Sequence, residues 1–160
     1  MVGAAIAVTK TITHDYTSVR DGVSGLIEVR ATSPLVITDY RDSSATPLAH
    51  VITSGTVLQT GKDKTGHVRF FTTFAFSDVT FDRVHSTEPC IPVSGKLTMT
   101  TYEEEGGKQL KQVAVTYSSA PSASVAGGVD PSLSVEGDDA NGTEAQWMLL
   151  HVDRRCDLKR

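Results

Sequence analysis

Alternation of apolar and polar residues is the dominant pattern along this chain of 160 residues. Residues 4–17 alternate cleanly except at Lys10, which falls on the apolar parity. The run therefore predicts a half-buried strand that lies at a sheet edge or leaves the core partway. Further strand patterns follow at residues 26–32, 35–40 and 48–60. Pro34 and Gly55 interrupt these runs. Pro34 indicates a strand end or a bulge, and Gly55 indicates a bulge or a bend.

The most apolar stretch lies at residues 67–86 and is rich in phenylalanine. Its apolar residues change parity along the way, from Phe74 and Phe76 to Val79 and Phe81. Because a shift of one residue moves every side chain to the other face of a sheet, we predict a bulge or turn near Ser77–Asp78. We expect this stretch to form the centre of the core.

A hairpin pattern follows at residues 94–119. The turn "EEEGGK" contains Gly106 and Gly107, which can adopt the positive φ of tight turns. Its glutamates predict a solvated tip, with a cation site as the alternative. The residues expected on the inner face of the hairpin are Leu97, Met99, Val113, Val115 and Tyr117.

Residues 118–144, "SSAPSASVAGGVDPSLSVEGDDANGTE", are small, polar and rich in glycine. They predict a long loop, with a short strand possible at 132–136, and residues 120–144 are our candidate contact surface. Hard oxygen ligands are concentrated here, as calcium requires, but their spacing does not match an EF-hand, and an ordinary acidic loop is the alternative. The candidate ligands are Asp130, Glu136, Asp138, Asp139, Asn141 and Glu144.

Together these patterns predict one all-β domain over residues 1–160, built as an antiparallel β-sandwich or open barrel of about eight strands with little or no helix. The last apolar run, at residues 146–152, fits either a strand or a helix.

The net charge of −4 argues against a nucleic-acid binder, which needs a basic surface. No apolar run approaches the ~18 residues of a transmembrane segment, and the apolar N-terminus lacks the basic region of a signal peptide. We find no metal-ligand spacing and no serine elbow, and no phosphate loop is present. The sequence therefore predicts no enzyme and no cofactor, with calcium as the one exception.

Cys90 and Cys156 are the only cysteines. Both stand beside turn or terminal segments, and neither lies in a reactive motif. An all-β composition is common among secreted domains, where disulfides form, so we predict a bridge between the two. Two free buried cysteines are the alternative.

The segments "PCIPVSGKLTMTTY" and "VDRRCDL" resemble the C-terminal half of extracytoplasmic β-proteins and lipoproteins of unknown function from Gram-negative bacteria. The likeness lies chiefly in residues 87–119 and 151–158. The chain differs from that pattern in having no lipobox. The resemblance implies an antiparallel fold and a periplasmic, secreted or outer-membrane-associated location, and it implies no activity.

The leading hypothesis is a non-enzymatic extracytoplasmic module that binds an unknown protein or surface ligand, or serves a structural role. The first alternative is a virion or phage structural or assembly protein, since such proteins are often small and all-β. The second is a small barrel that binds an apolar ligand beside the Phe-rich stretch. The sequence leaves the oligomeric state open.

Overall fold

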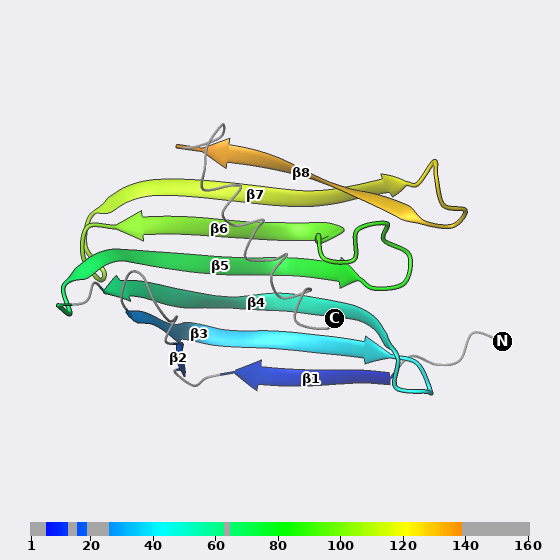
Figure 1. Cartoon of the computed structure of the whole chain (residues 1–160), viewed down its shortest axis with the longest axis horizontal. Helices are drawn as coiled ribbons and strands as arrows, with labels where there is room; N and C mark the ends of the chain where they lie inside the picture. The colour runs from blue at the N-terminus through cyan, green and yellow to red at the C-terminus, as the bar shows by residue number, and fades with distance from the viewer. Residues whose placement is uncertain (1–5, 13–15, 19–25, 63–64, 139–160) are drawn as a thin grey trace.

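A computed structural model of the chain describes residues 6–12, 16–18, 26–62 and 65–138. These residues form eight strands in one sheet, in the order β1-β3-β4-β5-β6-β7-β8, while the short β2 pairs with the start of β3. The strands are β1 (Ile6–Ile12), β2 (Tyr16–Ser18), β3 (Leu26–Arg41), β4 (Pro47–Lys62), β5 (Val68–Asp82), β6 (Ser94–Tyr102), β7 (Gln109–Pro121) and β8 (Val129–Gly137). Figure 1 shows the open sheet, with β1 and β8 at its two margins.

All named strand pairs are antiparallel, and no helix occurs in the described residues. The prediction of an antiparallel all-β fold with about eight strands is confirmed. The described strands belong to a single open sheet. The position of β1 at a margin also confirms the edge strand that Lys10 indicated.

One face of the sheet, here called the core face, carries the main cluster of buried apolar side chains, while Leu58 is buried on the opposite face. The predicted inner face of the hairpin lies on the core face, and Val113 is fully buried at its centre. Residues directly opposite each other on neighbouring strands share a face, so Phe74, Met99 and Val113 form one row across β5, β6 and β7. Burial of such side chains is the main stabilising term of the fold.

A line of irregularities crosses the sheet between β3 and β6, and we call it the bend line. It consists of Pro34–Val36 in β3, Gly55 in β4, Asp78 in β5 and Gly95 in β6. The pairing register of β3 with β4 shifts around Ser33–Val36, and that of β5 with β6 shifts between Ser77 and Thr80. The predicted bulges at Pro34, Gly55 and Ser77–Asp78 are thereby confirmed.

Positive φ angles mark three of these positions: 127° at Gly55, 49° at Asp78 and 103° at Gly95. Each glycine is also required by close contact. A Cβ at Gly55 would lie 2.6 Å from the Leu35 Cα, and one at Gly95 would lie 2.4 Å from the Asp78 carbonyl oxygen. The strands therefore change parity here, which keeps Ile52 and Val79 in the same core as Phe74 and Phe76.

Two expectations about burial are wrong. The Phe-rich stretch is not the core centre, because Phe74, Phe76 and Phe81 are only partly buried and pack against the more deeply buried β6–β7 hairpin. Strand β1 is not half-buried either, since every residue from Ile6 to Thr11 is exposed. The alternation of apolar and polar residues thus predicted the strands correctly, whereas the depth of burial depends on the position of each strand in the sheet.

The long loop expected at residues 118–144 is largely a hairpin. Strand β7 continues to Pro121, residues 122–128 form the connection, and β8 runs back along β7 without a register shift. The short strand considered at 132–136 is the centre of β8. The small polar residues predicted a loop, but serines that face each other on paired strands can hydrogen-bond and so are compatible with a sheet. Ser118 and Ser132 do so at 2.9 Å. Residues 139–144 lie outside the described part.

The tip of the β6–β7 hairpin is more than a solvated turn. All three glutamates are exposed, yet Glu105 forms an ion pair with Arg30 of β3. The tip therefore reaches across the face opposite the core toward the other half of the sheet.

Candidate functional site

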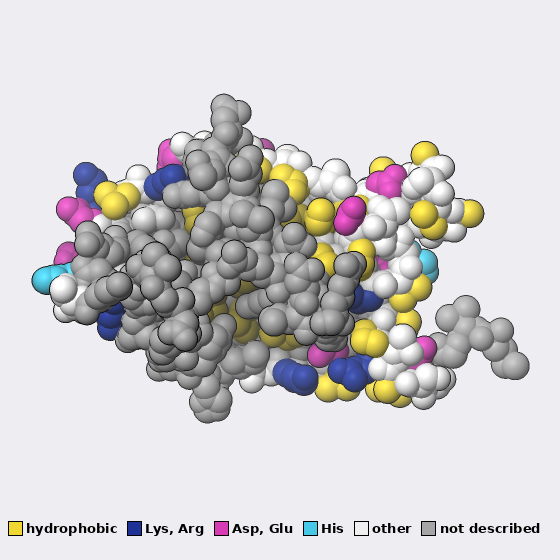
Figure 2. Space-filling model, viewed as in Figure 1, with side chains coloured by type: hydrophobic (Ala, Val, Ile, Leu, Met, Phe, Trp, Pro, Cys, Tyr) yellow, Lys and Arg dark blue, Asp and Glu magenta, His cyan; other side chains and the backbone are white. Residues whose placement is uncertain are grey.

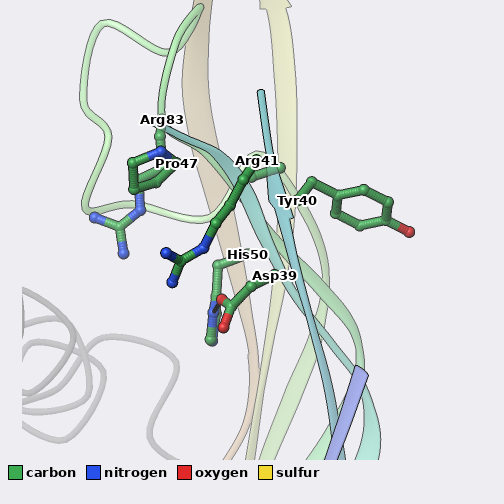
Figure 3. Close-up of a pocket in the computed structure, with 7 residues that line it drawn as sticks. Asp39, Tyr40, Arg41, Pro47, His50 and Arg83 are labelled. Carbon is green, nitrogen blue, oxygen red and sulfur yellow. Dashed lines mark hydrogen bonds and ion pairs between the residues drawn. The ribbon is translucent and has the colours of Figure 1, made fainter. Parts of the chain in front are cut away.

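A recess of about 380 Å³ lies where β3 ends, β4 begins and β5 runs into the next connection. Its lining residues are Asp39, Tyr40, Arg41, Pro47, Ala49, His50 and Arg83. Figure 3 shows the imidazole of His50, the carboxylate of Asp39 and the guanidinium of Arg41 on one side of the strands, with Tyr40 pointing away from them.

Asp39 and His50 form the centre of the recess. They are direct cross-strand partners of β3 and β4, and the His50 Nδ1 lies 2.6 Å from the Asp39 Oδ1. The Lys10 Nζ of β1 lies 3.6 Å from the other carboxylate oxygen. The hydrogen bond from His50 lowers the pKa of Asp39; burial works against this, and the charges of His50 and Lys10 add to the lowering.

The ring of His50 is held in a fixed orientation. Its Nδ1 bonds to Asp39, and its edge meets the ring of Phe81 at a centroid distance of 5.8 Å and an interplanar angle of 61°. The guanidinium carbon of Arg83 lies 5.9 Å from the centroid of that same ring. Nε2 makes no hydrogen bond within the described residues, and 27% of the side chain is exposed. A ligand can therefore reach a nitrogen whose direction is already set.

Among the described residues, basic side chains outnumber acidic ones at the recess. Arg41 and Arg83 line it together with one carboxylate, that of Asp39, and Lys10 lies beside that carboxylate, in a chain whose net charge is −4. Arg41 is exposed and makes no ion pair in the part of the chain that the structure describes. Figure 2 shows basic side chains along the margin of the sheet where β1 lies in Figure 1. The recess is a local basic site on an acidic protein.

This arrangement is suited to an anion. A guanidinium offers parallel N–H donors that match a carboxylate or a phosphate. Because the Nδ1–H of His50 donates to Asp39, its Nε2 is an acceptor in the neutral ring and donates to an anion only in the imidazolium form. Among the seven lining residues only Tyr40 has a hydroxyl group, and it points away from the pair. The lining thus supplies guanidinium donors beside a fixed imidazole and presents no hydroxyl or thiol toward it.

The predicted disulfide cannot be followed to both ends. Cys90 is half-buried in the connection between β5 and β6, and Cys156 lies outside the described residues. The bridge therefore stays a prediction.

The predicted calcium ligands do not come together in the described residues. Asp130 lies at the start of β8 and Glu136 near its end, about 20 Å apart at the rise of an extended strand. Asp130 accepts a 2.8 Å hydrogen bond from the Thr87 Oγ1, which with bonds from Ser122 and Ala123 lowers its pKa against the effect of burial. Asp138 accepts a 2.8 Å bond from the Gln112 N–H. Asp139, Asn141 and Glu144 lie outside the described part.

Sequence reasoning missed the recess. The available signal was the parity of β3 after the bulge, where Asp39 and Arg41 follow Ile37 on the core face. Two charged side chains at positions where apolar ones are expected indicate a site at the rim of a core. The interruption at Pro34 concealed this parity.

Comparison of the chain with models of protein families, with curated proteins and with solved structures finds no match. The described part of the chain contains no helix long and apolar enough to cross a membrane.

Proposed function

We propose that this chain is a non-enzymatic binding module that holds an acidic group of a protein or surface ligand in the recess. The observation that carries the proposal is the exposed guanidinium of Arg41, without an ion pair among the described residues, beside an imidazole fixed by Asp39. The ligand group is a carboxylate or a phosphate, because both accept the paired donors of arginine.

The character of the lining supports binding over the alternatives. An apolar ligand would find mainly charged and polar side chains in the recess. A hydrolytic reaction through an acyl-serine or acyl-cysteine type of intermediate would need a hydroxyl or thiol within reach of His50, and the one hydroxyl of the lining points away. An extracytoplasmic location is part of the proposal and rests on the resemblance and the predicted disulfide.

A virion or phage assembly protein is the second candidate. The open sheet favours it, because an unpaired margin offers backbone donors and acceptors to a neighbouring chain. In that setting the recess would hold an acidic group of the adjoining subunit.

The test uses sodium phosphate and sodium acetate as probes, with sodium chloride at matched ionic strength as the reference. We expect phosphate or acetate to shift the NMR resonances of His50 and Asp39 in a saturable way. Replacing Arg41 with Gln should weaken this binding about tenfold, because a charge-assisted hydrogen bond is lost.

Arg30→Gln is the matched control, since Arg30 lies in the same strand but is paired with Glu105. It should leave the titration unchanged. Equal binding by the Arg41→Gln variant and the unchanged protein, or equal shifts with chloride, would refute the anion site.

A further inference from the structure

The two margins of the sheet differ in how they are protected. At the start of β8, the N–H and C=O of Val129 point away from β7 and bond to the His85 carbonyl oxygen at 2.9 Å and the Thr87 N–H at 3.0 Å. Because this direction alternates along a strand, Pro131 also turns its nitrogen outward, and proline has no N–H to donate. Asp130 and Glu136 add negative charge. The β8 margin is therefore closed to a further strand.

The β1 margin is less protected in its described residues, because its one charged side chain, Lys10, is paired with Asp39 of β3. Strand β1 contains no proline and pairs with β3 from Ile6 to Ile12 without a register shift. Two apolar side chains on the core face, Ile6 and Val8, are 54% and 42% exposed. Among the described strands, none lies beyond β1 on that side (Figure 1). A straight, exposed edge of this kind offers its backbone to another strand.

We propose that β1 pairs with β1 of a second copy of the chain, antiparallel and with the two-fold axis at Thr9. In this register Thr9 pairs with Thr9, Ala7 with Thr11 and Val8 with Lys10 of the other copy. The exposed side chain of Val8 then meets the aliphatic stem of a lysine. The partner is a second copy of the chain, because a two-fold axis at Thr9 places Val8 of each copy against Lys10 of the other.

The charged residues and Pro131 favour the pairing of β1 with β1 over the pairing of β8 with β8 or of β1 with β8. Each Lys10 is already paired with Asp39 of its own copy, so the two lysines do not meet as free like charges. Pairing of β8 with β8 would bring acidic residues together, and pairing of β1 with β8 would meet Pro131. A strand of seven residues gives a small interface, so the dimer forms reversibly and depends on concentration.

The first test is sedimentation over a range of protein concentrations. We expect the mass to rise from 17.1 kDa toward twice that value. Replacing Val8 with Lys should raise the dimer dissociation constant at least about tenfold, because each interface gains two charges beside existing lysines. Val125→Lys is the matched control, since Val125 is 49% exposed in the distant β7–β8 connection. Circular dichroism verifies the fold of both variants.

A monomer at all concentrations would overturn the proposal. A dimer that tolerates Val8→Lys would overturn it as well, because the contact would then lie on another surface.

The second test measures the register with single cysteine substitutions, Thr9→Cys and Thr11→Cys. In the proposed pairing the two copies of position 9 lie directly opposite each other, within the Cα separation that a disulfide allows. The two copies of position 11 would be offset by four positions, about 13 Å along the strand. Under mild oxidation we expect a covalent dimer from Thr9→Cys and none from Thr11→Cys beyond the background of the unchanged protein. Equal cross-linking of the two variants, or none in either, would refute the register.

Discussion

The β6–β7 hairpin and the far end of the β3–β4 pair differ in the regularity of their pairing and in what they place on the core face. From Gly95 to Thr101 the hairpin keeps one register and buries Val113 and Val115 almost completely. The β3–β4 pair shifts register around Ser33–Val36 and then presents Asp39 opposite His50, both about three-quarters buried.

The difference shows how one face of a sheet can hold both a core and a charged recess. Before the bend line the apolar parity of each strand points into the core. After it the parity of β4 and β5 is exchanged, so Ile52 and Val79 remain in the core. Beyond them, Asp39 of β3 and His50 of β4 bring polar and charged groups to the rim of the core. Stability should therefore depend chiefly on the hairpin, and ligand binding on the recess.

The largest effect is expected from a cavity in the hairpin. Met99→Ala should lower the free energy of unfolding by about 3 kcal/mol, because Met99 is buried in the core cluster. Leu110→Ala, an exposed position of the same hairpin, should change it by less than about 0.5 kcal/mol. Urea denaturation measures both values. Similar losses in the two variants would contradict the position of the core.

An intermediate effect is expected at the bend line. Gly95→Ala should cost at least about 2 kcal/mol of unfolding free energy, because the new Cβ meets the Asp78 carbonyl and φ is positive. Gly106→Ala should cost about 1 kcal/mol, since its φ is also positive but no atom lies within 4 Å of the added Cβ. Thermal unfolding of both variants measures the difference. If the costs are equal, close packing between β5 and β6 is not what requires Gly95.

The smallest effect is expected in the recess. The pKa of Asp39 is lowered in the folded chain, so its contribution to stability is present above the unfolded pKa of about 3.9 and is lost as pH falls through the lower folded value. Asp39→Asn should remove this part of the pH dependence. It should cost less than about 1 kcal/mol near neutral pH, because the pair is partly solvated.

Urea denaturation from about pH 2 to pH 7, the range over which carboxyl groups titrate, measures this dependence. The exposed Glu136→Gln is the control. An unchanged acid limb in the Asp39→Asn variant would show that the Asp39–His50 pair does not stabilise the fold.

Much of the fold follows from local pattern, and the site does not. The inner face of the hairpin is readable because Leu97, Met99, Val113 and Val115 alternate without interruption. The parity change at Asp78 is also readable, since Phe76 and Val79 cannot share a face otherwise. The contact between Asp39 and His50 cannot be predicted from the sequence, because it depends on how many residues the bulge at Pro34 inserts into β3 relative to Gly55 in β4. No property of either residue type fixes that number.

Strands β3 to β8 each pair with their neighbours in the chain, and this order has a kinetic consequence. Pairing between neighbours closes short loops, which costs less entropy than joining distant segments, so these hairpins can form independently and zip together. Strand β1 is different, because it pairs with the second half of β3 and not with β2, the next strand in the chain. During synthesis β1 emerges first, yet its pairing surface exists only once β3 has been made. Its edge thus joins the sheet late and is the first to be released when the chain opens from that side.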